Sequence, residues 1–251
     1  MKKTIITIIA LVMSAPLAHA DIYGPSLVGF WTFDSVRTSS GANNVIESSG
    51  KGLNGTMTNS PTATLGKVDQ ALNFTGTANV DVVDASDADF VGPVSISAWV
   101  YITTGSNFSM IFSKAAGAGT TNNPIEFRTD NSAVPLLASV RGVSTGVFAD
   151  TSTATVSLNA WHQVAVTYPD NQDTSDLTYY IDGAAVGCNC AHLGAGAQPT
   201  GTGADILIGR RPDGLNMLGK IDDLRVYNRT LSAAEIAQIY DQQLAHTWST
   251  F

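Results

Sequence analysis

Two carboxylates on one predicted strand are the first residues in the sequence that could carry chemistry. Glu126 and Asp130 stand at positions i and i+4 of the run IEFRTD, and Arg128 lies between them. A glycoside hydrolase needs two carboxyl groups about 5–9.5 Å apart across the bond that it cleaves. On an extended strand these two positions are roughly 13 Å apart. We therefore interpret the run as a solvated charged ladder in which Arg128 neutralises both acids.

Histidines offer a second kind of chemistry, as general bases. His162, His192 and His246 follow the first twenty residues, and none of them belongs to a His-Glu-x-x-His zinc motif. We interpret His162, next to Trp161 on a predicted strand, as a packed or hydrogen-bonded histidine rather than a base. A lyase that uses a His, a Tyr and an Arg carried on strands stays open as an alternative.

The two cysteines, Cys188 and Cys190, are separated by one residue. An exported protein can keep such a pair as a disulfide. Residues i and i+2 on an extended chain lie near the upper limit of about 7 Å for the Cα atoms of a disulfide, so closure requires a bent loop. His192 could join the pair in a soft-metal site, but three ligands within five residues are too cramped for structural zinc. We predict a local disulfide that stiffens a loop, with free thiols and then a metal as alternatives.

The first twenty residues are typical of a secretory signal peptide. Lys2 and Lys3 form a charged start, residues 5–13 form an apolar stretch, and Ala18-His19-Ala20 is a small-x-small cleavage site. The apolar stretch is too short to span a bilayer, and no later segment approaches the ~20 apolar residues that a spanning helix needs. We predict that residues 1–20 are removed and that the protein is secreted, either to the periplasm or outside the cell.

The charge balance restricts the partners. The chain has 21 Asp and Glu against 13 Lys and Arg, a formal net charge of −8. Such a surface repels nucleic acid and anionic membranes, so we predict neither nucleic-acid binding nor membrane insertion. An acidic surface suits solubility outside the cell or a role for divalent cations. The sequence does not indicate the oligomeric state.

Short β-type runs, separated by Gly, Asn, Asp, Ser and Thr, occupy most of the chain. Many strands with frequent turn signals and little helical periodicity indicate a sandwich or a barrel. Without an internal repeat or a linker, residues 21–251 are predicted to form one domain, with a core of about 25–243. The runs are 27–34, 70–76, 78–84, 94–102, 108–114, 125–130, 135–141, 161–168, 177–183, 205–210 and 219–227.

Alternation within two of these runs predicts which face of each sheet is buried. In residues 94–102, apolar side chains share one face, whereas Trp99 and Tyr101 share the other face with two serines. In residues 125–130, Glu126 and Arg128 lie opposite two apolar residues. One face would pack the core of a two-sheet sandwich, and the polar face with its aromatic side chains could meet a ligand.

One short helix is predicted near the C-terminus. Ser232 and Glu235 have the spacing of a capping box. Ile236, Ile239 and Tyr240 then form an apolar stripe at i, i+3 and i+4. Because so short a helix depends on packing more than on helix propensity, we expect it to lie against the edge of the sandwich.

In order along the chain, these features resemble the laminin-G-like jelly rolls of the concanavalin A-like lectin and glucanase superfamily. The resemblance implies an all-β fold, a two-sheet antiparallel jelly-roll sandwich with a short C-terminal helix. It does not decide function, because this fold serves lectins, adhesins, glycanases and passive spacer modules. The segments that carry it are LVGFWTFD (27–34), ESSGKGLNGT (47–56), VSISAWVYI (94–102), WHQVAVTY (161–168), YYIDG (179–183) and GKIDDLRVYNRTLSAAEIAQIY (219–240).

The resemblance also implies a calcium site. In this superfamily the first and last strands lie side by side, which would bring Asp34 and Glu47 close to Asp222 and Asp223. Ca²⁺ takes 6–8 oxygen ligands and tolerates irregular geometry, so these carboxylates predict a structural Ca²⁺. The sequence departs from the family loop, since Glu47 replaces the usual Asp and Lys51 the usual Asn. The alternative is an edge strand kept soluble by its charge, with one Asp capping a turn.

For function we predict an exported, non-catalytic module that binds a polysaccharide or a glycoconjugate, in adhesion or in an extracellular matrix. An aromatic ring can meet the face of a pyranose while carboxylates and arginines hydrogen-bond to its hydroxyls. One alternative is a polysaccharide lyase or glycoside hydrolase with an atypical site, although the Glu-x-Asp-x-x-Glu strand of the β-glucanases is absent. Another is a structural spacer, with Trp99 and Tyr101 simply packed between the sheets. The candidate ligand-binding residues are Trp99, Tyr101, Glu126, Arg128 and Arg141.

Overall fold

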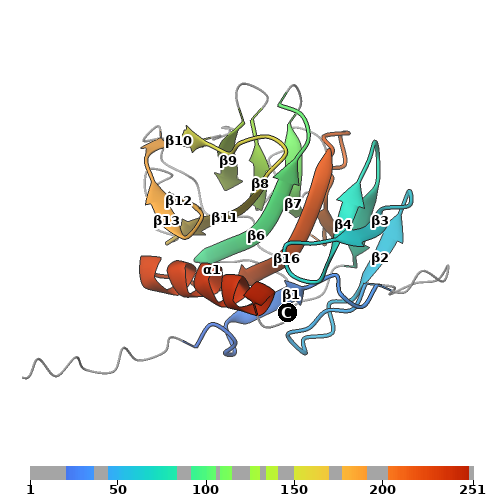
Figure 1. Ribbon diagram of the computed structural model, residues 1–251, viewed down its shortest axis with the longest axis horizontal. Coiled ribbons are helices and arrows are strands. Elements are labelled where there is room, and N and C mark those ends of the chain that lie inside the picture. Colours follow the sequence, from blue (N-terminus) through green and yellow to red (C-terminus); the bar gives the residue numbers. More distant parts are fainter. Residues whose placement is uncertain are drawn as a thin grey trace, which may run out of the picture.

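The residues that the computed structural model describes form two antiparallel eight-stranded sheets, which are stacked as layers, with one helix against one of them (Figure 1). The predicted two-sheet antiparallel jelly roll with a C-terminal helix is confirmed. The structure describes residues 21–36, 45–83, 92–105, 108–114, 125–130, 134–140, 150–169, 177–190 and 203–248. The predicted signal peptide, Arg141 and His192 lie outside these ranges.

The first sheet, sheet A, contains the longest strands of the chain. Its order is β13-β12-β11-β6-β16-β4-β3, and β1 also pairs with β16. The strands are β1 (Leu27–Trp31), β3 (Thr62–Leu65), β4 (Gln70–Phe74), β6 (Val94–Ile102), β11 (Trp161–Tyr168), β12 (Thr178–Ile181), β13 (Ala184–Val186) and β16 (Gly219–Tyr227).

The second sheet, sheet B, has the order β14-β10-β9-β8-β7-β15-β5-β2. Several of its strands are short and rich in Thr and Ser, and residues of this kind are also typical of turns. The strands are β2 (Gly55–Thr58), β5 (Asn79–Val82), β7 (Ser109–Lys114), β8 (Ile125–Thr129), β9 (Pro135–Val140), β10 (Asp150–Thr155), β14 (Cys188–Asn189) and β15 (Ile206–Ile208).

The main core fills the space between the two sheets, as the alternation predicted. From β6, the five apolar side chains of the inner face join this core, and from β8, Ile125 and Phe127 do so. Tyr179 of β12 links the layers, because its hydroxyl accepts a hydrogen bond from the backbone N–H of Ala138 in β9 at 2.9 Å. The outer faces are therefore left for the helix and for solvent.

The first and last strands pair with each other, as the resemblance implied. Leu224–Tyr227 of β16 pairs with β1, whereas Gly219–Ile221 pairs with β4. Asp222 and Asp223 lie where the strand changes partner, and the register with β6 shifts there. Asp223 has a positive φ of 48°, which is typical of a bulge that re-aims side chains.

The helix α1 (Ala233–Trp248) begins with the predicted capping box. The backbone N–H of Ser232 donates to Glu235 at 2.7 Å, and that of Glu235 donates to the Ser232 hydroxyl at 3.3 Å. Ile236 and Ile239 are fully buried in a second core, with residues of β1, β11, β12 and β16. The helix therefore covers part of the outer face of sheet A. Among the described residues, no helix is long and apolar enough to cross a membrane.

Cys188 and Cys190 form a disulfide, with their Cα atoms 5.1 Å apart. This separation is well below that of residues i and i+2 on an extended chain, so the backbone bends here as the sequence required. Both cysteines pack against the main core. The disulfide therefore closes a small loop at the edge of sheet B.

Candidate ligand-binding site

The structure divides the predicted ligand-binding residues between the two sheets. Trp99 and Tyr101 lie on the outer face of β6 in sheet A, whereas Glu126 and Arg128 lie on the outer face of β8 in sheet B. The outer faces of a sandwich point in opposite directions. These four side chains therefore do not form one site, and Arg141 lies outside the described residues.

On sheet A, Trp99 is enclosed and Tyr101 is partly exposed. The ring of Trp99 is 1% exposed and stacks on Tyr240 of α1, with a centroid separation of 5.5 Å. The ring of Tyr101 meets the edge of Trp161 at 5.7 Å, and the Lys220 ammonium lies 5.2 Å from the Tyr101 centroid. Tyr101 and its two neighbours thus form a small aromatic and cationic surface, while Trp99 packs the helix onto the sheet.

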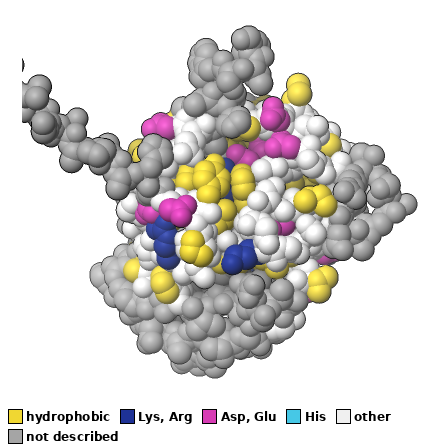
Figure 2. Space-filling view, turned by 90° about the horizontal axis from the view of Figure 1, so that it is seen from below, with side chains coloured by type: hydrophobic (Ala, Val, Ile, Leu, Met, Phe, Trp, Pro, Cys, Tyr) yellow, Lys and Arg dark blue, Asp and Glu magenta, His cyan; other side chains and the backbone are white. Residues whose placement is uncertain are grey.

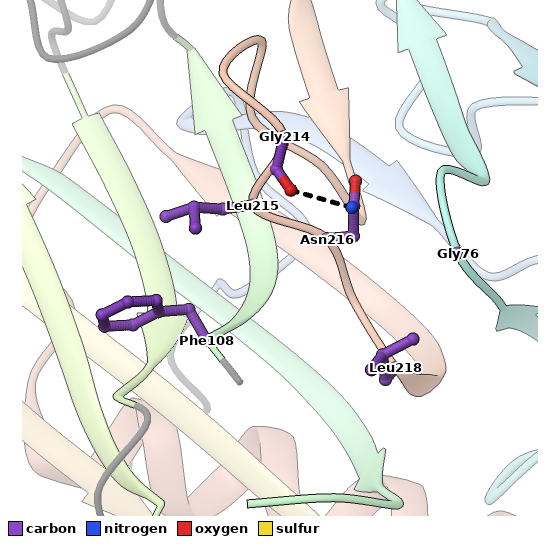
Figure 3. Close-up of a pocket in the computed structure, with 6 residues that line it drawn as sticks. All are labelled: Gly76, Phe108, Gly214, Leu215, Asn216 and Leu218. Atoms are coloured by element: carbon purple, nitrogen blue, oxygen red, sulfur yellow. Dashed lines mark hydrogen bonds between the residues drawn. The ribbon is translucent and has the colours of Figure 1, made fainter. Parts of the chain in front are cut away.

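A cavity of about 330 Å³ lies near Arg128, at one end of the sandwich. Its lining comes from three separate segments: the β4–β5 turn, the residue before β7 and the loop between β15 and β16 (Figure 3). Ligand pockets in proteins usually measure about 300–1,000 Å³, so this cavity can hold a small ligand or one or two sugar rings. It is lined by Gly76, Phe108, Gly214, Leu215, Asn216 and Leu218.

The β15–β16 loop is folded tightly by its own backbone. Arg210 and Asn216 form an isolated antiparallel bridge. Within it, the N–H of Arg211 donates to the carbonyl of Leu215 at 2.8 Å, and the N–H of Gly214 donates to the carbonyl of Arg211 at 3.0 Å. Gly214 has a φ of 97°, which an L side chain rarely adopts. The loop is therefore a defined turn that holds the cavity wall in place.

A buried charge cluster joins this loop to sheet B. Arg211 donates from one guanidinium nitrogen to both carboxylate oxygens of Glu126, at 3.1 and 2.9 Å, and it also binds Asp213. Hydrogen bonds from Arg211 hold the pKa of Asp213 below its ordinary value, so this acid stays ionised. Glu126 is fully buried. Glu126 anchors the loop through Arg211, so the interpretation of this run as a solvated ladder is wrong at Glu126. Arg128 contacts Phe108, which lines the cavity.

The cavity offers both stacking and hydrogen bonding. The Arg128 guanidinium carbon lies 4.3 Å from the centroid of Phe108. Asn216 donates from Nδ2 to the carbonyl of Gly214 at 2.8 Å, which orients its amide (Figure 3). The Oδ1 atom of Asn216 is buried and has no hydrogen-bond partner within the protein. An unsatisfied buried acceptor is costly, and this atom is enclosed by the protein rather than open to the cavity.

Sequence reasoning missed most of this site. Phe108 and Asn216 flank strands in separate parts of the chain, and Arg211 is 85 residues from its partner Glu126. The run GRRPDGLN, residues 209–216, does show a turn in its Pro, Asp, Gly and Asn. That signal locates a loop, but it does not indicate which strand the loop packs against.

The predicted calcium ligands lie near the junction of β1, β4 and β16. Asp34 accepts the N–H of Gln70 at 2.9 Å, and Asp222 accepts the N–H groups of Lys67 and Val68 at 2.8 and 2.9 Å. On the face of the molecule shown in Figure 2, acidic side chains gather beside a hydrophobic patch.

Glu47, in the 45–54 segment, makes backbone contacts of its own. It accepts hydrogen bonds from the N–H groups of Phe30, Ser49 and Lys51. These three bonds tie Glu47 to the loop that contains it and leave about one of the four acceptor positions of its carboxylate.

Burial, followed by repulsion from Asp223, raises the pKa of Asp222 from 3.8 to about 8. Its Oδ1 atom is buried without a hydrogen-bond partner. Asp34 and Asp223 also line a cavity of about 190 Å³. Within the ranges that the structure describes, however, no three His, Cys, Asp or Glu side chains converge in an arrangement that could hold a metal ion. A cation here would need backbone carbonyls to complete its coordination.

A family model of the concanavalin A-like lectin/glucanases superfamily matches residues 74–237. The chain belongs to this superfamily. Its matched region runs from the end of β4 into α1 and includes every lining residue of the 330 Å³ cavity. No curated protein sequence matches the chain.

Solved structures with the same fold share little sequence with this superfamily member. The binding domain of Paraclostridial Mosquitocidal Protein 1 is 14% identical, with a TM-score of 0.64 over 86% of this chain and 52% of the other. Domain 4 of AbnA, an arabinanase from Geobacillus stearothermophilus in complex with arabinotriose, is 19% identical, with a TM-score of 0.56 over 86% and 98%. Trypanosoma rangeli sialidase is 16% identical, with a TM-score of 0.60 over 88% and 33%. This chain thus spans about half of the first structure and a third of the sialidase.

Proposed function

We propose that this protein is an exported module that binds a polysaccharide or a glycoconjugate in the cavity beside Phe108. The observation that carries the proposal is a cavity lined by an aromatic ring, two leucines and an asparagine, in which the aromatic ring also contacts the Arg128 guanidinium. A role in adhesion or in an extracellular matrix follows from export together with polymer binding.

The chemistry of the lining suits a sugar. The apolar face of a sugar ring can pack on Phe108 and on the leucines of the β15–β16 loop, Leu215 and Leu218. A hydroxyl group can then hydrogen-bond to the exposed part of the Asn216 amide, because Asn216 also lines the cavity. Mostly apolar walls with few, well-placed polar atoms are the usual composition of a small-molecule site. The proposal therefore assigns binding to stacking and orientation to Asn216.

Proteins of similar fold support the proposal without deciding it. Domain 4 of the arabinanase was solved with arabinotriose, and two of the similar structures are toxin binding domains. Each of these is less than 20% identical to this chain, and function within one fold varies widely.

The same proposal includes removal of the signal peptide, residues 1–20, and export of the mature chain as a single domain. A disulfide between Cys188 and Cys190 agrees with an oxidising compartment such as the periplasm or the extracellular space. Mass spectrometry of the protein purified from culture medium or periplasm should find an N-terminus at Asp21. An N-terminus at Met1 or Lys2 would contradict export through this leader.

Calcium at the strand junction also remains a proposal. It is supported by the partnerless Oδ1 of Asp222 and by the repulsion among Asp34, Asp222 and Asp223. A bound ion stabilises only the folded state, by about 2.7 kcal/mol at a hundredfold excess over Kd. Chelator should therefore lower the melting temperature by several degrees, and calcium, but not sodium at matched ionic strength, should restore it. An unchanged melting curve would exclude the ion.

A glycan array followed by calorimetry tests the binding proposal. The wild type should bind a defined set of glycans, and Phe108→Ala should weaken binding at least tenfold, because it removes the stacking ring. Tyr101→Ala is the matched control, since it removes a partly exposed aromatic ring from the other sheet. If Tyr101→Ala abolishes binding and Phe108→Ala does not, the ligand binds on sheet A. If no glycan binds, the module is a spacer or recognises another class of partner.

A further inference from the structure

Three polar side chains near the start of β11 form a hydrogen-bonded chain. The hydroxyl oxygen of Ser157 lies 2.7 Å from Nε2 of His162, and Nδ1 of His162 lies 2.8 Å from Oδ2 of Asp182. Serine, histidine and an acid in this connectivity are the parts of a nucleophilic catalytic triad, which is recognised by geometry rather than by sequence order. His162 and Asp182 lie in two of the segments that carry the family resemblance, WHQVAVTY and YYIDG, but no sequence motif joined them to Ser157.

The neighbours of His162 assign its tautomer. A carboxylate oxygen faces Nδ1, so Nδ1 carries the proton and donates it to Asp182. The backbone N–H of Ser157 points to Nε2 at 3.3 Å, which identifies Nε2 as an acceptor. The single lone pair on Nε2 is shared between this N–H at 3.3 Å and the hydroxyl proton of Ser157, whose oxygen lies closer at 2.7 Å. This is the protonation state that a general base needs.

Asp182 is held in place by a tight hairpin turn. Asp182 and Gly183 are the two central residues between β12 and β13, with φ values of 51° and 76°, as in an Asp-Gly turn of type I′. Its Oδ1 atom accepts the N–H of Gln163 at 3.0 Å, and its own N–H donates to the carbonyl of Gln163 at 2.8 Å. The carboxylate is thus held by one backbone N–H through Oδ1, and it orients the imidazole through Oδ2.

The nucleophile itself is accessible. Ser157 is exposed in the loop between β10 and β11, whereas the His162 side chain is only 19% exposed. The loop is tied to sheet A, because the N–H of Asn159 donates to the carbonyl of Ile102 at 2.8 Å. A substrate can therefore reach Ser157 from solvent while the base behind it stays sheltered.

We propose that Ser157 is a nucleophile for acyl transfer from carboxylic esters, with His162 as its general base and Asp182 as a positioning residue. The Ser157 oxygen attacks the ester carbonyl carbon, and its proton moves to Nε2 of His162. The carbon–oxygen bond to the alcohol breaks, and His162 returns the proton to the departing oxygen. Water then attacks the acyl-serine by the same route, which releases the acid and regenerates the serine.

The exposure of Ser157 defines the substrate class. Cleavage of an amide requires a water-excluding site with donors aimed at the oxyanion, and an exposed loop position does not exclude water. Esters with small acyl groups and good leaving groups need less assistance. The site therefore suits small carboxylic esters, and this activity does not depend on the proposed glycan binding.

Fluorophosphonate labelling of the full mature chain tests the assignment, because the probe forms a covalent bond only with an activated serine. The wild type should gain one adduct, mapped by peptide mass spectrometry to Ser157, and should hydrolyse p-nitrophenyl acetate above the buffer rate. Ser157→Ala and His162→Gln should lose both signals. Asp182→Asn should label at least tenfold more slowly, while its melting curve shows that the fold is retained.

Two matched controls make the result decisive. Ser60→Ala removes an exposed serine from the β2–β3 turn and should label like the wild type. Ser144→Ala removes the serine of a Gly-x-Ser-x-Gly sequence, residues 142–146, that lies outside the described residues, and it should also label normally. The proposal is overturned if the wild type gains no adduct, if the adduct maps elsewhere, or if Ser157→Ala lowers only the melting temperature. Those outcomes would leave the three side chains as a link between the β10–β11 loop and the β12–β13 turn.

Discussion

At the scale of single residues, the adjacent acids in the middle of β16 have separate tasks. Asp222 satisfies two backbone N–H groups of the β3–β4 turn, from Lys67 and Val68. Asp223 takes the positive φ of the bulge, and its carboxylate lies 3.5 Å from the guanidinium of Arg225. Asp222 is fully buried. Its ionisation should therefore be visible in the stability of the whole domain.

Substituting Asp222→Asn tests this electrostatic role in calcium-free buffer. In the wild type the pKa is about 8, against an ordinary value of 3.8 in the unfolded chain. As pH rises from about 4 to about 8, the unfolded chain ionises this group while the folded chain keeps its proton. The free energy of unfolding therefore falls over this window, by on the order of a few kcal/mol.

Asparagine does not titrate, so the variant should lose this part of the pH dependence. Urea unfolding of both proteins at several pH values measures the difference. Parallel pH profiles for the wild type and the variant would show that Asp222 ionises normally in the folded protein.

For single residues, the sequence predicts which face of a strand a side chain occupies better than it predicts which residue that side chain contacts. The alternation of residues 125–130 correctly placed Glu126 and Arg128 on the outer face of a strand. It could not predict that Arg211 binds Glu126, because such a pair depends on how a distant loop folds back. The Ser157–His162–Asp182 group was not predicted for the same reason, although the Asp-Gly turn that holds it was visible in YYIDG.

At the scale of elements, the long strands and the helix follow from the sequence and the short strands do not. The bounds of β6, β11 and β16 match the predicted runs. In β6 and β11 the apolar alternation is sustained, whereas in β16 it is interrupted by the bulge at Asp222 and Asp223. β3 and β10 were missed because Thr and Ser serve both turns and strands, and only pairing with a neighbour decides between them. The capping box and apolar stripe of α1 were both confirmed.

Replacing Ile239 with alanine tests what holds α1 to sheet A. Ile239 is fully buried in the second core with Tyr227 and Leu231. Removing its side chain should cost about 2–4 kcal/mol of unfolding free energy, as for other large-to-small changes in a core. Asp241→Ala, at an exposed position of the same helix, should change stability by less than about 0.5 kcal/mol. Equal effects of the two substitutions in urea unfolding would show that the helix is not held by this core.

At the scale of the whole molecule, the two sheets present different outer faces. Part of the outer face of sheet A is covered by α1, which buries Trp99. The 330 Å³ cavity lies instead at one end of the sandwich, where loops from both sheets meet. The Ser157 loop is tied to the same end, since Ile102 binds Asn159 and the next residue, Thr103, binds Leu218 of the cavity. The side chains to which we assign function by proposal therefore gather where strands end.

A crystal structure of the protein with the glycan selected on the array would test the central claim most directly. The account predicts sugar density in the cavity, with one ring packed on Phe108 and a hydroxyl within hydrogen-bond distance of the Asn216 amide. Density on Tyr101 and Trp161, with the cavity filled only by water, would contradict the assignment of this cavity as the binding site.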